Sequence, residues 1–247
     1  MLLCGIMKAM NSLNNFISGL LTSYLTKTSE SRAKPTTNNI ELLTEAIRPG
    51  DVLLVEGKQR FSTAIKYLTQ SNWSHVAIYI GKRDDAEHEL LEADLEQGVI
   101  TLPLSTYATF HTRICRPINL HSEDLESIIL FCLARLGHTY DVKNIFDLAR
   151  YLLPLPPVPT RFKRSLLTFG SGDPTKAICS SLIAEAFQKV HYPIVPRLEQ
   201  VKSRKRFKKF HPSFYVPSDF DRSPYFEIIK PTPLGGFDYK SMPWDEV

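Results

Sequence analysis

The stretch from Ser74 to Gly81, SHVAIYIG, constrains the fold more than any other part of the chain. Its apolar and β-branched residues predict a buried strand, and the glycine at its end predicts a turn. A histidine, His75, stands at the mouth of this strand, where its side chain can reach into a cleft while the strand holds it still. A buried imidazole needs a polar partner. We therefore weigh two interpretations of His75, a functional group and a core histidine bonded to the backbone.

The composition is that of an ordinary globular protein, with 43% hydrophobic and 23% charged residues among 247. The net charge of +4 is too small to indicate a nucleic-acid binder by itself, and we do not expect nucleic acid as a partner. The four cysteines are scattered without a CxxC pair, which predicts neither a zinc site nor a disulfide framework. The acidic residues and the histidine at 84–88 lie in a predicted turn and are interpreted as surface. We expect no metal and no cofactor.

The chain divides into four predicted parts. Residues 1–27 repeat apolar side chains at helical spacing, which predicts an amphipathic helix that docks on the domain or a partner, or lies on a membrane surface. This segment lacks the basic start of a secretory signal and is too polar to span a bilayer. Residues 28–40 are interpreted as a linker, 41–235 as one folded domain and 236–247 as a tail.

Short apolar segments separated by turns predict an antiparallel sheet that curls against helices, an α+β fold. The predicted strands are residues 52–56, 75–80, 89–93, 98–102 and 112–116. Helices are predicted at 61–70, at 122–136 with Ser122 as the cap, and from Asp173 to Val190. Four prolines between residues 151 and 159 predict an extended loop near the cleft.

Cys179 lies near the start of the last predicted helix, on its apolar face. Helical spacing places it in one stripe with the residues three, four, seven, eight and eleven positions later, Leu182, Ile183, Ala186, Phe187 and Val190. At a helix start, unpaired backbone N–H groups and the helix dipole favour a thiolate and can receive an oxyanion. The alternative is that Cys179 is a small core residue, the interpretation that we give to Cys132.

Glu92 is the predicted partner of His75. If the strands at 75–80 and 89–93 pair as a hairpin, Glu92 can accept the Nδ1–H of His75, which leaves Nε2 facing the thiol of Cys179. Glu89 and Asp94 are rivals for this role. We favour Glu92 because it is flanked by Leu91 and Ala93 and is therefore the most readily buried.

Several segments in this order resemble the circularly permuted papain-like cysteine hydrolases, relatives of the NlpC-type cell-wall peptidases, and most of all their YiiX/YaeF-like branch. In ordinary papain-like enzymes the cysteine helix precedes the histidine strand, whereas here it follows. The matching segments cover roughly residues 48–230 and are RPGDVLL (48–54), SHVAIYIG (74–81), LEA (91–93) with Gly98-Val99, GHTYD (137–141), CSSLI (179–183) and PSDF (217–220).

The resemblance implies a permuted papain-like fold in which Cys179 is the nucleophile, His75 the base and Glu92 the orienting acid. It also implies a substrate pocket, for which Tyr140, Ser180 and Trp73 are candidates. The expected activity is hydrolysis of an amide bond in a peptide or an amino-acid conjugate.

Two other functions stay open. A lipid-directed acyltransferase or thioesterase would use the same Cys/His pair, and a non-catalytic binding module would keep only the cleft. Residues Lys202–Lys209 hold six cations among eight residues, which predicts either a solvated loop or, together with the N-terminal helix, a contact with an anionic membrane. We expect a cytoplasmic or membrane-peripheral protein of a bacterium.

Overall fold

The computed structural model describes residues 39–82, 87–94, 97–139, 178–201 and 204–231. The predicted N-terminal helix, most of the linker, the Pro-rich loop, Tyr140 and the C-terminal tail lie outside the described residues.

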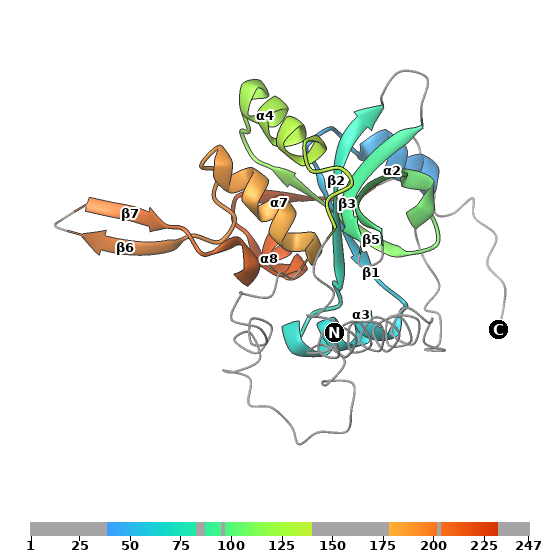
Figure 1. Cartoon of the computed structure of the whole chain (residues 1–247), viewed down its shortest axis with the longest axis horizontal. Coiled ribbons are helices and arrows are strands. Elements are labelled where there is room, and N and C mark those ends of the chain that lie inside the picture. Colours follow the sequence, from blue (N-terminus) through green and yellow to red (C-terminus); the bar gives the residue numbers. More distant parts are fainter. Residues whose placement is uncertain (1–38, 83–86, 95–96, 140–177, 202–203, 232–247) are drawn as a thin grey trace, which may run out of the picture.

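Six strands among the described residues form one antiparallel sheet in the order β4-β3-β2-β1-β5-β8 (Figure 1). The strands are β1 (Val52–Glu56), β2 (His75–Lys82), β3 (His88–Asp94), β4 (Gly98–Pro103), β5 (His111–Pro117) and β8 (Phe226–Ile229). The helices are α2 (Ile40–Ala46), α3 (Arg60–Thr69), α4 (Ser122–Leu133), α7 (Ile178–Lys189) and α8 (Pro217–Arg222), with short 3-10 turns at Leu104–Tyr107 and Pro212–Phe214. The predicted α+β fold with an antiparallel sheet is confirmed.

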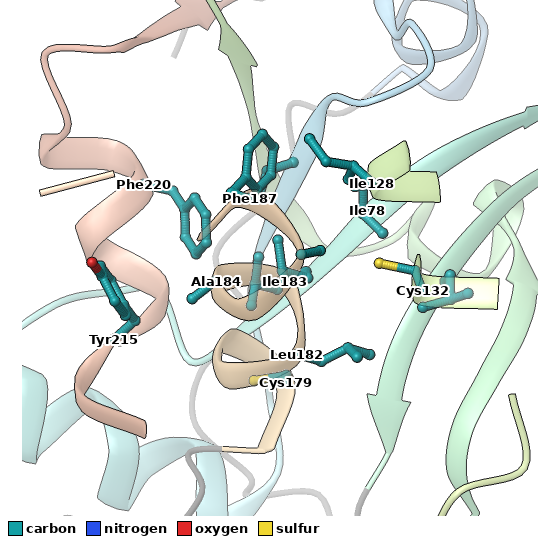
Figure 2. Close-up of a cluster of buried hydrophobic side chains, with 14 of the residues drawn as sticks. Ile78, Ile128, Cys132, Cys179, Leu182, Ile183, Ala184, Phe187, Tyr215 and Phe220 are labelled. Atoms are coloured by element: carbon teal, nitrogen blue, oxygen red, sulfur yellow. The ribbon is translucent and has the colours of Figure 1, made fainter. Parts of the chain in front are cut away.

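Both faces of the sheet are covered, which explains why the strands are apolar throughout. One face carries Val76 and Ile78 and packs against α4, α7 and α8. The other carries Ala77 and Tyr79 and packs against α2 and the turn at Leu104–Tyr107. Figure 2 shows the first cluster, in which the side chains of α7 lie between α8 on one side and the sheet with α4 on the other.

Three boundaries differ from the sequence prediction. Strand β2 continues through Gly81, which adopts a left-handed φ of 101° at an irregularity in the pairing with β3 rather than in a turn. Helix α4 ends at Leu133, three residues early, and a turn follows it. The cap of α4 is His121, so Ser122 is its first helical residue and no side chain caps this end.

Residues 197–208 form a separate antiparallel ribbon of β6 (Arg197–Val201) and β7 (Arg204–Lys208), which projects from the body of the protein (Figure 1). Part of the basic segment, for which the sequence also allowed a loop, is therefore a strand. These residues show only a weak alternation of apolar and polar side chains, and their many cations therefore did not indicate a strand. Among the described residues, none of the helices has the length and apolar character needed to cross a membrane.

Candidate active site

His75 and Glu92 come together on neighbouring strands, as the predicted hairpin requires. His75 opens β2 opposite Val55 of β1, and Glu92 follows Leu91, which pairs with Ile78 of β2. The Nε2 atom of His75 lies 2.9 Å from Oε2 of Glu92. The N–H direction departs from an ideal hydrogen bond, so this contact is a close ion pair rather than a well-aligned bond.

The ring nitrogen that meets the carboxylate is not the predicted one. We expected Nδ1 of His75 to face Glu92, but Nε2 does. The reason is geometric, because His75 stands at the start of β2 and Glu92 lies farther along the sheet. The imidazole must reach along the strand, and its outer nitrogen makes the contact.

The rival acids have other neighbours. Glu89 pairs with Gly81 and Pro103 at the far end of β3. Asp94 ends β3, and its carboxylate accepts a hydrogen bond from the backbone of Gln97 at 2.8 Å. Glu92 is thus the carboxylate at His75, and it is only 5% exposed.

Tyr107 is a member of this site that sequence reasoning missed. Its hydroxyl donates to Oε2 of Glu92 at 2.6 Å, the same oxygen that His75 approaches. Tyr107 ends the short turn after β4, on the second face of the sheet. Burial, with the adjacent Glu92 carboxylate, raises the pKa of the Tyr107 hydroxyl, so it remains a proton donor over the whole working range of pH.

Cys179 is the second residue of α7 and is 8% exposed. Figure 2 shows it in the first turn of the helix, with Leu182 in the next. The predicted apolar stripe is observed, because Leu182, Ile183, Ala186 and Phe187 are all buried in the same cluster. The Cys179 thiol influences the charge of His75, because it is one of the groups that raise the pKa of the imidazole.

The two partners of His75 decide its charge. Burial by itself would lower the pKa of the imidazole, but the Glu92 carboxylate and the Cys179 thiol outweigh burial and hold the pKa well above its ordinary value. In the same way, burial would raise the pKa of Glu92, yet the imidazolium and the Tyr107 hydroxyl hold it below its ordinary value. The site therefore favours a charged His75–Glu92 pair.

The predicted pocket residues have different environments. Trp73 is buried, donates its Nε1–H to Asp221 at 3.2 Å, and lines an open cavity of about 610 Å³. Ser180 is fully buried, and its hydroxyl donates to the carbonyl of Tyr215 at 2.6 Å, which ties α7 to the segment before α8. Tyr140 lies outside the described residues.

The remaining titratable groups do not gather into a metal site among the described residues. His88, from the predicted acidic turn, lies with its Nδ1 2.5 Å from the Tyr79 hydroxyl. Cys115 and Cys132 are buried in the core, where burial raises the pKa of each thiol, that of Cys132 to about 12.

Part of the chain is similar to a family of papain-like enzymes. Residues 46–151 match a family described as permuted papain-like amidase enzymes, the YaeF/YiiX, C92 family. This span contains His75, Glu92 and Tyr107 and stops before Cys179. Over these residues, the match agrees with the predicted family and with the predicted class of enzyme, a papain-like amidase.

One solved structure that resembles the chain is described as the metalloprotein yiiX from Escherichia coli O157:H7. The two share 16% sequence identity over 75% of this chain and 97% of that one, with a TM-score of 0.48. No curated protein matches the chain.

Proposed function

We propose, on the premise that residues 46–151 are those of a permuted papain-like amidase, that this chain hydrolyses amide bonds with a Cys179–His75–Glu92 triad. One observation carries the proposal: Nε2 of His75 lies 2.9 Å from the carboxylate of Glu92, and the thiol of Cys179 acts with that carboxylate to raise the pKa of the same imidazole. A core histidine would need one polar partner, whereas this one has both an acid and a potential nucleophile.

In the proposed reaction, His75 takes the proton of the Cys179 thiol. Because Nε2 lies at Glu92, Nδ1 is the ring nitrogen left for the sulfur. The thiolate attacks the carbonyl carbon of the amide, and backbone N–H groups at the start of α7 stabilise the oxyanion. The C–N bond then breaks as protonated His75 gives its proton to the leaving amine, which forms a thioester. His75 next takes a proton from water, whose oxygen attacks the thioester and releases the acid and the free thiol.

Burial lowers the pKa of His75, whereas the Glu92 carboxylate raises it. The carboxylate stabilises the imidazolium that accompanies the thiolate, and the buried setting strengthens that attraction. The Tyr107 hydroxyl keeps the carboxylate ionised and fixed in place. Peptides and amino-acid conjugates are the proposed substrates.

The test is amide hydrolysis by purified Cys179→Ala and Cys179→Ser variants, with circular dichroism to confirm folding. We expect turnover to be abolished in both. Cys4→Ser, which changes a cysteine outside the described residues, serves as the matched control and should keep full activity. Turnover retained by a folded Cys179→Ala protein would reject the assignment.

A lipid-directed acyl transfer or thioester hydrolysis with the same pair is the second candidate. It is favoured by the basic sequence of residues 202–209, part of which is strand β7 of the projecting ribbon. Together with residues 1–27, this segment is proposed to contact an anionic membrane.

Liposome flotation tests the membrane contact, because binding should require anionic lipid. Equal binding to neutral vesicles would remove the electrostatic basis. Intact-mass detection of an acyl-enzyme formed from lipid but not from peptide would decide for the second candidate.

A further inference from the structure

The open cavity of about 610 Å³ is lined by none of the three triad residues, but two of its lining residues follow or precede triad segments closely in the chain. Its wall includes Trp73, two residues before His75 in the chain. Ser218 of α8 also lines the cavity. It lies three residues after Tyr215, whose carbonyl accepts the hydrogen bond of Ser180, the residue next to Cys179. The cavity wall therefore includes a residue near His75 in the chain and a residue near the segment to which Ser180 is hydrogen-bonded.

Both carboxylates that line the cavity already accept hydrogen bonds or ion pairs. Asp221 receives Arg113 on Oδ1 at 2.6 Å and the indole N–H of Trp73 on Oδ2 at 3.2 Å. Glu56 has Lys66 at 3.5 Å from Oε1 and His111 at 3.2 Å from Oε2. These acids are thus engaged with groups of the protein, which disfavours the binding of a cationic ligand.

The cavity does, in contrast, have hydrogen-bond donors that are available to a ligand. The hydroxyl of Ser218 has no hydrogen-bond partner among the described residues, although the side chain is only 1% exposed. A buried hydroxyl without a partner is uncommon and calls for one. Arg222, on the same helix, is exposed and forms no ion pair among the described residues. Arg113 uses one terminal nitrogen on Asp221 and keeps further N–H groups.

We propose that this cavity binds a carboxylate group of the substrate, with Arg222 and Ser218 as the donors. The charge of Arg222 is not balanced within the cavity, and a carboxylate would balance it while giving Ser218 its missing acceptor. This inference rests on the proposed function and narrows its substrate class to amides that carry a free carboxylate, such as N-acyl amino acids and peptides with an open C-terminus.

The experiment measures binding and turnover separately. Calorimetry on the full chain with Cys179→Ala compares acetyl-dialanine with its C-terminal carboxamide, and succinyl-alanine 4-nitroanilide with acetyl-alanine 4-nitroanilide. We expect the carboxylate member of at least one pair to bind about tenfold tighter, since a single charge-assisted contact at a partly exposed site is worth roughly that much.

Arg222→Gln and Ser218→Ala, each added to Cys179→Ala, should erase this preference. Ser218→Ala should also leave the melting temperature unchanged or higher, because it removes an unpartnered buried hydroxyl. Lys230→Gln, which removes an exposed cation outside the cavity, is the matched control and should keep the preference.

The outcomes separate this inference from the proposed function. No preference in either pair, or a preference that survives Arg222→Gln, overturns the carboxylate site, even if the wild-type chain hydrolyses amides. A preference that depends on Arg222 supports the site. If such binding is found but no amide is hydrolysed by the wild type, the site stands and the amidase proposal falls.

Discussion

Replacing Tyr107 with phenylalanine removes one oxygen atom from the acid end of the proposed triad. The ring stays in its place, packed edge-on against Phe110 at 5.4 Å between centroids. What is lost is the 2.6 Å hydrogen bond to Oε2 of Glu92. Because Glu92 is buried and keeps only its approach to His75, the substitution isolates one donor to one carboxylate.

The magnitude follows from the charge on the acceptor. A hydrogen bond to a charged group contributes about 1.5–3 kcal/mol, and its loss from a buried carboxylate should lower the free energy of unfolding by roughly that amount. If about half of this loss weakens the support of the imidazolium in the transition state, kcat/KM should fall about four- to thirteenfold.

The pH dependence of kcat/KM shows in which direction the pKa of Glu92 changes. The Tyr107 hydroxyl helps to hold the pKa of Glu92 below its ordinary value, so its removal raises that pKa. As the pH falls, the variant loses the Glu92 charge earlier than the wild type does. The acid limb of the kcat/KM profile should therefore move to higher pH.

Tyr79→Phe is the matched control. Tyr79 is also a buried tyrosine on the same face of the sheet, and its hydroxyl lies 2.5 Å from His88 rather than at Glu92. We expect it to lose stability without moving the acid limb. If Tyr107→Phe and Tyr79→Phe give the same profile, the role that we assign to Tyr107 is refuted.

Two further predictions concern stability. Asp51→Asn should lower the free energy of unfolding, measured in urea, by about 3 kcal/mol. The buried Asp51 carboxylate accepts hydrogen bonds from Arg116 at 2.7 and 2.9 Å, and the substitution leaves that guanidinium without its counter-charge. A loss below about 1 kcal/mol would contradict this prediction. Glu92→Gln should destabilise the protein most between pH 4.5 and 6.5, which are the ordinary pKa values of Glu and His. Because the fold lowers the pKa of Glu92 and raises that of His75, both groups are charged and stabilising throughout this range. This difference should shrink as the pH rises through the raised pKa of His75, whereas Glu89→Gln should show no such dependence.

The parts of the site that the sequence predicted depend on short-range regularities. The strand of His75 and the apolar stripe of Cys179 follow from period-two and helical spacing, and the choice of Glu92 follows from a hairpin between consecutive strands. Each of these needs only the residues within one or two elements.

The parts that it did not predict depend on tertiary packing. Tyr107 reaches Glu92 because a 3-10 turn after β4 folds back over the sheet, and no periodicity marks that turn. The ring nitrogen that meets Glu92 depends on how far the imidazole must reach across the sheet. The partners of Asp221 and Glu56 in the cavity come from residues up to 148 positions apart, which a single sequence does not bring together.

The rate of alkylation of Cys179 tests the central claim most directly, because it needs no substrate. Iodoacetamide at mildly acidic pH, followed by peptide mapping, reports which thiol is ionised. Burial raises the pKa of the Cys115 and Cys132 thiols, so these two cysteines serve as slow references within the same chain. If His75 and Glu92 activate Cys179, it is labelled well before Cys115 and Cys132, and His75→Ala removes the difference. Labelling of Cys179 no faster than that of the two references, or labelling unchanged by His75→Ala, would contradict the triad and favour a binding module without catalysis.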